Sequence, residues 1–158
     1  MFVGRKKELD ALNSRYKSNR KEFGVLYGRR RIGKSSILNE FLKGKKGILF
    51  QAKQDNSYGN LKSFSYEVDH LLNLPDTFVF ASWQHAFKSI QEYAKNERFV
   101  LIIDEYPYIV SQDSSFSSVL QEFIDHTSDN MMVILSGSDI GSVSYTHLRA
   151  HETSQDLV

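Results

Sequence analysis

The sequence of 158 residues predicts an α/β fold of three layers, in which helices cover both faces of a parallel sheet. Two observations predict it. Short apolar runs alternate with segments whose apolar residues recur every three or four positions, and this alternation is typical of strands joined by crossover helices. A glycine-rich segment also lies between the first apolar run and the helical segment after it, where such folds bind anions.

Four apolar runs are expected to form the sheet. Each is short, is followed by glycine or polar residues, and is apolar at nearly every position, as strands buried on both faces are. The third run is the most apolar of the four. The runs are Phe23–Tyr27, Gly47–Ala52, Phe99–Ile103 and Met131–Leu135, whereas Phe78–Phe80 is too short to assign.

Five segments carry apolar residues along one helical face and are expected to pack on the sheet. Ser82 is expected to cap the fourth, because a serine hydroxyl can accept a hydrogen bond from an unpaired N–H of the first turn. Gly44 is expected to end the second, and Pro75 follows the end of the third. The helices are expected within Met1–Ser18, Lys34–Lys43, Leu61–Leu72, Trp83–Ala94 and Phe116–Ile124.

Composition bounds the function. Hydrophobic residues make up 41% and charged residues 25%, which is ordinary for a globular domain with one core. The formal net charge of +1 argues against a general nucleic-acid coat, and the lack of cysteine excludes disulfides, zinc–thiolate sites and thiol catalysis. No run is long enough to span a bilayer and no apolar signal core begins the chain, so we expect a cytoplasmic protein without a membrane partner.

The segment Gly28–Ser35 reads G-R-R-R-I-G-K-S and fits the phosphate-binding pattern G-x-x-x-x-G-K-[ST]. The two glycines allow a tight turn whose N–H groups surround an anion, and the next helix points its positive dipole end at the same place. Lys34 would then reach the β- and γ-phosphates of a nucleotide, and the Ser35 hydroxyl would ligate Mg²⁺. The residues expected around the phosphates are Gly28, Arg29, Arg30, Arg31, Ile32, Gly33, Lys34, Ser35 and Ser36.

The three arginines of this loop have a second interpretation, as a nucleic-acid patch or as extra phosphate ligands. We favour solvated side chains at permissive positions, because the loop needs only their backbone N–H groups. Tyr106 and Tyr108 likewise could stack on a base or on a partner, although packing in the core is the favoured interpretation. The five histidines show no spacing to carboxylates that indicates a metal site.

A second motif follows the most apolar run, where Asp104 and Glu105 end the strand. Ligands of open parallel sheets bind at the carboxyl ends of the strands, so this pair and the phosphate loop should meet in one crevice. Asp104 is then expected to hold Mg²⁺, and Glu105 to orient and polarise a water molecule that attacks the γ-phosphate. The alternative is that the pair only ends a strand and begins a turn with Pro107.

Taken together, four motifs resemble the ATPase domain of the prokaryotic P-loop family often called archaeal ATPases, within the STAND/AAA+-like branch that uses an additional catalytic glutamate. The motifs are Phe2-Val3-Gly4-Arg5 with Glu8-Leu9, Gly28–Ser35, Ile103-Asp104-Glu105-Tyr106-Pro107-Tyr108 and Ile134-Leu135-Ser136-Gly137-Ser138. Their order and spacing are more specific than any one of them.

The resemblance implies a three-layer P-loop NTPase fold with the strand order 5-1-4-3-2, in which the last strand and the lid are missing from this chain. The strand that carries Ser136 would lie between the strands that precede Lys34 and end in Asp104. Val3, Gly4 and Arg5 would lie near the adenine and ribose. Ser136 or Ser138 would be the polar sensor beside the γ-phosphate, with Ser136 favoured. The sequence also lacks the guanine-specific N-K-x-D box, which favours adenine over guanine as the base.

These observations predict ATP binding and Mg²⁺-dependent ATP hydrolysis by a domain that acts as a nucleotide-driven switch. Two alternatives stay open. One is a nucleotide-gated regulatory or DNA-associated scaffold with little hydrolysis, and the other is a P-loop kinase for a small molecule. A DNA or protein partner would bind through C-terminal regions that this chain lacks, and the domain could form a homo-oligomer.

The segment from Val143 to the end lacks the apolar periodicity of the preceding chain. It resembles translated adapter or vector sequence, so residues 1–142 are expected to form an incomplete ATPase core and residues 143–158 a non-native or disordered tail. A short genuine helix around Leu148 is the alternative.

Overall fold

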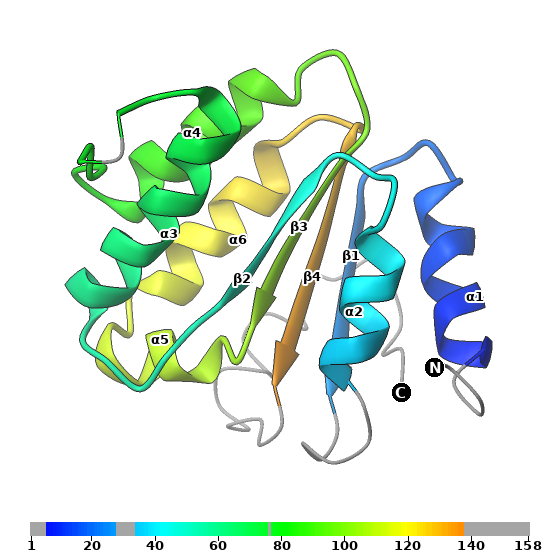
Figure 1. Cartoon of the computed structure of the whole chain (residues 1–158), viewed down its shortest axis with the longest axis horizontal. Coiled ribbons are helices and arrows are strands. Elements are labelled where there is room, and N and C mark those ends of the chain that lie inside the picture. Colours follow the sequence, from blue (N-terminus) through cyan, green and yellow to red (C-terminus); the bar gives the residue numbers. More distant parts are fainter. Residues whose placement is uncertain (1–5, 28–33, 76, 138–158) are drawn as a thin grey trace.

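The computed structural model describes residues 6–27, 34–75 and 77–137. Four parallel strands form one sheet in the order β1-β4-β3-β2 (Figure 1). The strands are β1 Glu22–Tyr27, β2 Gly47–Gln51, β3 Phe99–Asp104 and β4 Met131–Gly137. The position of β4 between β1 and β3 confirms the order expected for these four strands.

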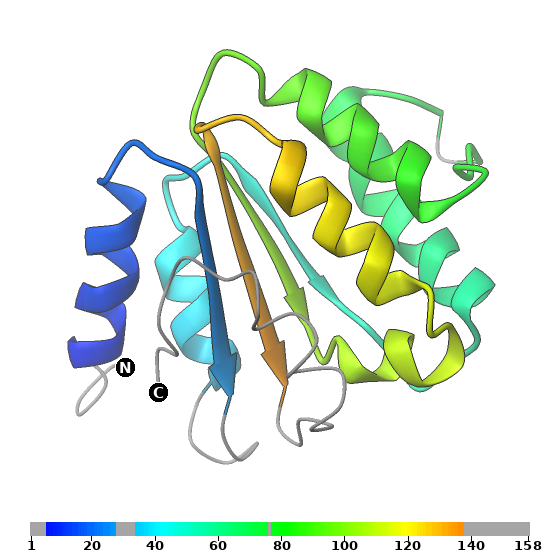
Figure 2. The same ribbon diagram turned by 180° about the vertical axis from the view of Figure 1, so that it is seen from behind.

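Helices cover both faces of the sheet, which confirms the three-layer α/β prediction. Helices α1 and α2 lie on one face, and α3, α4 and α6 lie on the other (Figures 1 and 2). The helices are α1 Lys6–Tyr16, α2 Lys34–Leu42, α3 Ser57–Leu72, α4 Trp83–Tyr93, α5 Pro107–Gln112 and α6 Phe116–His126. In the described part of the chain, no helix is both long and apolar enough to cross a membrane.

Alternate side chains of the strands feed two separate cores. In β3, Val100 and Ile102 pack with Leu12 of α1 and Phe41 of α2, while the residues between them face α3, α4 and α6. Every residue of β3 and β4 is buried. Because a parallel strand at the centre of a sheet is covered on both faces, the apolar pattern of these strands is continuous rather than alternating.

Polar side chains define several helix ends. The Ser82 hydroxyl accepts a hydrogen bond from the His85 N–H at 3.2 Å, which confirms it as the N-cap of α4. At α3, the side chain of Asn56 accepts from the Gly59 N–H at 2.7 Å, so this helix begins at Ser57, before the first apolar residue of its stripe. Gly44 follows α2 with φ 76°, a left-handed conformation that glycine adopts without a steric penalty.

Helix α5 was not expected from the sequence. The residues after Asp104 form a short helix instead of a simple turn, and Pro107 begins it. Proline is well tolerated there, because the first residues of a helix do not use their N–H groups in helical hydrogen bonds. Tyr106 and Ile109 are both fully buried and anchor this helix to the core. Phe78–Phe80 forms no strand, although Phe80 is buried.

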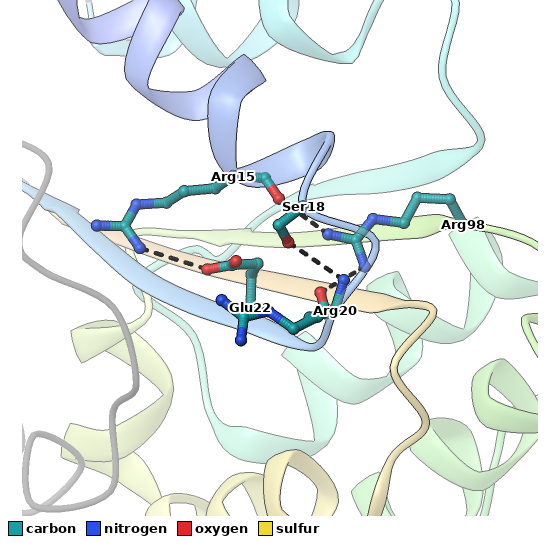
Figure 3. Close-up of polar contacts among 5 residues, drawn as sticks. All are labelled: Arg15, Ser18, Arg20, Glu22 and Arg98. Atoms are coloured by element: carbon teal, nitrogen blue, oxygen red, sulfur yellow. Dashed lines mark hydrogen bonds and ion pairs between the residues drawn. The ribbon is translucent and has the colours of Figure 1, made fainter.

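Arg98 connects the loops at the amino ends of the strands. Its guanidinium donates hydrogen bonds to four backbone carbonyls, those of Arg15 at 3.1 Å, Tyr16 at 3.0 Å, Arg20 at 2.7 Å and Asp129 at 2.7 Å. Figure 3 shows its guanidinium reaching the backbones of Arg15 and Arg20, while the Arg15 side chain extends away from it and forms an ion pair with Glu22 at 3.3 Å. The start of β3 is thereby tied to the end of α1 and to the loops before β1 and β4.

Candidate nucleotide-binding site

The polar residues predicted from separate motifs meet at the carboxyl ends of neighbouring strands. Asp104 ends β3, and its register partner in β4 is Ser136. Ser136 is in turn the register partner of Leu26 in β1, the strand that leads toward the phosphate-loop motif. Ser35 is the last residue of that motif and lies in the first turn of α2. The sheet register therefore brings three chain segments to one place.

Asp104 uses its two carboxylate oxygens differently. Oδ1 accepts hydrogen bonds from the Ser136 hydroxyl at 2.7 Å and from the Glu105 N–H at 2.9 Å, whereas Oδ2 lies 3.5 Å from the Ser35 hydroxyl. Asp104 is 3% exposed and Ser136 is fully buried. A buried carboxylate needs such donors, because burial without them strongly disfavours its charged form.

The donor set fits a small hard cation. The Ser35 hydroxyl and Asp104 Oδ2 are both oxygens, they come from two different elements, and Ser35 is exposed. Magnesium prefers oxygen ligands and usually takes one or two from the protein, completing its shell with water and phosphate oxygens. Ser35 and Asp104 would be the two protein ligands at this position.

Glu105 has an unusual backbone conformation. Its φ is 55°, in the left-handed region that residues other than glycine rarely adopt. The conformation is fixed on both sides, because the Glu105 N–H donates to Asp104 Oδ1 and the Tyr106 N–H donates to the Ser136 carbonyl at 3.2 Å. Backbone strain of this kind, of order 1 kcal/mol or more, is typical of functional sites.

Tyr106 packs in the core, as expected, and its ring is fully buried beneath the turn that carries Glu105. Burial raises the pKa of its phenol well above the ordinary value, because the charged form is desolvated. The hydroxyl has no hydrogen-bond partner among the described residues. Tyr108 is half-buried and packs against the same core.

Other predicted site residues lie outside the described part. These are Val3, Gly4, Arg5, Gly28, Arg29, Arg30, Arg31, Ile32, Gly33 and Ser138. Lys34 begins α2, but only its backbone is described, while Ser36 is an exposed residue of the same first turn. The phosphate contacts of this loop therefore stay a prediction from its sequence.

The hydrogen bond from Ser136 to Asp104 was missed by the sequence analysis, which considered Ser136 only as a neighbour of the γ-phosphate. A signal was present in the sequence. If β3 and β4 are adjacent and parallel, two polar residues at their carboxyl ends can meet side by side.

Comparison with known proteins decides the family. The model of a family described as an ATPase domain predominantly from Archaea matches residues 2–155. The chain belongs to this family. The match extends past Val143, and the interpretation of residues 143–158 as a non-native tail stays a prediction.

Two relatives of this archaeal-type ATPase domain come from one organism. An uncharacterised protein of Methanocaldococcus jannaschii is 29% identical over 125 residues, which are 79% of this chain and 26% of that protein. An uncharacterised ATP-binding protein of the same organism is 46% identical over 46 residues, which are 29% of this chain and 78% of that protein. The chain therefore spans about a quarter of the length of the first relative.

A solved structure has a similar fold. The Aeropyrum pernix ORC1 protein, solved in complex with DNA, is similar with a TM-score of 0.68 at 12% identity, over 96% of this chain and 44% of that chain. At this identity the likeness concerns the fold. Family and fold together make this chain a nucleotide-binding ATPase domain.

Proposed function

We propose that this domain binds ATP with Mg²⁺ and hydrolyses it, and that it acts as a nucleotide-driven switch. The convergence of Asp104 and Ser136, at the carboxyl ends of β3 and β4, with Ser35 in the first turn of α2 carries the proposal. Two motifs that are about seventy residues apart in sequence meet there. If Asp104 and Glu105 only ended a strand, no such meeting would be needed.

Each residue has a proposed role. Lys34 and the N–H groups of Gly28–Gly33 would hold the phosphates, and Ser35 with Asp104 would hold Mg²⁺, which when bound neutralises charge on the β- and γ-phosphate oxygens. Glu105 would accept a hydrogen bond from the attacking water and orient it. Its left-handed backbone is held in place next to Asp104, so the position from which its side chain extends is fixed. Val3, Gly4 and Arg5 would lie near the adenine.

Glu105→Gln tests the catalytic part of this proposal. The variant keeps the shape of the side chain and removes its ability to accept a proton, so ATP should still bind while turnover falls by about 100-fold or more. Phosphate released from ATP with no acceptor present is the readout, and Glu97→Gln, an exposed residue near the amino end of β3, is the matched control. Unchanged turnover in Glu105→Gln would reject the role of Glu105.

The same assay separates the alternatives. Release of phosphate without an acceptor indicates hydrolysis, whereas phosphate transfer that needs an added small molecule indicates a kinase. The DNA-associated scaffold draws support from the structural likeness to a protein solved with DNA. In that case the protein should bind DNA with an affinity that falls as salt rises, and with little dependence on Glu105.

A further inference from the structure

Ser136 is a buried polar residue at the carboxyl end of β4, and its hydroxyl donates to Asp104. We infer that it acts as a positioning residue for the metal ligand Asp104, and not as a donor to the γ-phosphate. This inference rests on the proposed binding of Mg²⁺ and ATP. It assigns Ser136 a role through the carboxylate that it contacts.

The Ser136 hydroxyl can donate only one hydrogen bond at a time. A serine hydroxyl has one proton to donate, and Ser136 donates it to Asp104 Oδ1 at 2.7 Å. A phosphate oxygen also needs a donor, so Ser136 cannot serve it while this bond exists. Hydrogen bonds to a buried carboxylate are among the stronger ones in proteins, and both partners here are shielded from water.

The orientation of the carboxylate is the second argument. The terminal torsion of an aspartate is broad and selects no single plane by itself. In Asp104 the Ser136 hydroxyl and the Glu105 N–H both bind Oδ1, which leaves Oδ2 on the side of the Ser35 hydroxyl. Without the Ser136 hydroxyl, Oδ1 would lose the shorter of these two hydrogen bonds, and Oδ2 would be presented less well to a cation.

The two contacts of Ser136 can be separated experimentally. Its carbonyl accepts from the Tyr106 N–H and supports the turn at Glu105, while its hydroxyl supports Asp104. Ser136→Ala removes only the second contact. Ser136→Thr keeps a hydroxyl, and Ser136→Cys keeps the side-chain volume with a weaker donor.

Calorimetric titration of the full chain with ATP over a range of Mg²⁺ concentrations, and in EDTA, tests the inference. Ser136→Ala should raise the Mg²⁺ concentration for half-maximal enhancement of ATP binding by about tenfold or more, as is typical when a residue behind a metal ligand is lost. ATP affinity in EDTA should not change. Ser136→Thr should stay near the wild-type Mg²⁺ requirement, and Ser136→Cys should lie between the two, which keeps the test decisive if the alanine variant does not fold.

The matched control is Ser65→Ala. Ser65 is a fully buried serine of α3 whose hydroxyl accepts from the Phe80 N–H at 3.1 Å, so its loss affects the fold but not the Mg²⁺ requirement. An unchanged Mg²⁺ requirement in Ser136→Ala, together with a reduced preference for ATP over ADP, would overturn the inference and restore a γ-phosphate role. A wild-type chain that binds no ATP would instead overturn the proposed function, and the inference with it.

Discussion

At the scale of the residue, Tyr106 carries a hydroxyl that is buried without a partner among the described residues. A buried, unsatisfied polar group destabilises the folded state by about 1–3 kcal/mol. Tyr106→Phe removes the group and keeps the ring, so the free energy of unfolding should stay the same or rise by about 1 kcal/mol. Urea unfolding followed by circular dichroism measures it.

Tyr93→Phe is the control for this change. Tyr93 is only half-buried, and its hydroxyl is not among the buried polar atoms that lack a partner, so removing it should give no gain in stability. A loss of more than about 1 kcal/mol in Tyr106→Phe would contradict the account and indicate that the buried hydroxyl has a partner that stabilises the fold.

At the scale of the element, Arg98 determines how α1 and the loops before β1 and β4 meet the start of β3. Its planar guanidinium serves four carbonyls at once, whereas a lysine ammonium has three donors on a flexible stem. Arg98→Lys should therefore lower the free energy of unfolding by about 2 kcal/mol, mainly because backbone carbonyls lose donors.

Chemical denaturation again provides the measurement, with Lys95→Ala as an exposed neighbour that should change stability by less than about 0.5 kcal/mol. Equal stability of Arg98→Lys and the parent protein would show that water or lysine satisfies these carbonyls as well as arginine does.

Elements also show what the sequence could predict. The strands were predictable because each is an apolar run between polar segments, and the N-cap of α4 was predictable because Ser82 immediately precedes an apolar stripe. Helix α5 was not, because its six residues are too few to establish a helical period and Pro107 is equally typical of a turn. Arg98 left no signal, since its partners are backbone carbonyls, which any residue type provides.

At the scale of the whole molecule, the site arises from topology. Asp104 could be predicted from the sequence because it ends the most apolar strand, and ligands bind at the carboxyl ends of parallel strands. Its contact with Ser136 depends on the insertion of β4 between β1 and β3 and on the register that pairs these residues. The expected strand order implied that β3 and β4 are neighbours, but it did not specify the hydrogen bond between Ser136 and Asp104.

Binding of ATP by the segment Gly28–Ser35 underlies every proposed role in the site, and Lys34→Ala removes the one charged group of that segment proposed to hold the β- and γ-phosphates. Isothermal titration calorimetry of ATP in the presence of Mg²⁺ should give a clear binding heat for the parent chain and none for Lys34→Ala. The variant lacks the positive charge that is expected to contact the β- and γ-phosphates. Lys43→Ala, at an exposed residue just after the end of α2, should bind like the parent. Equal ATP affinity in Lys34→Ala and the parent would contradict the account.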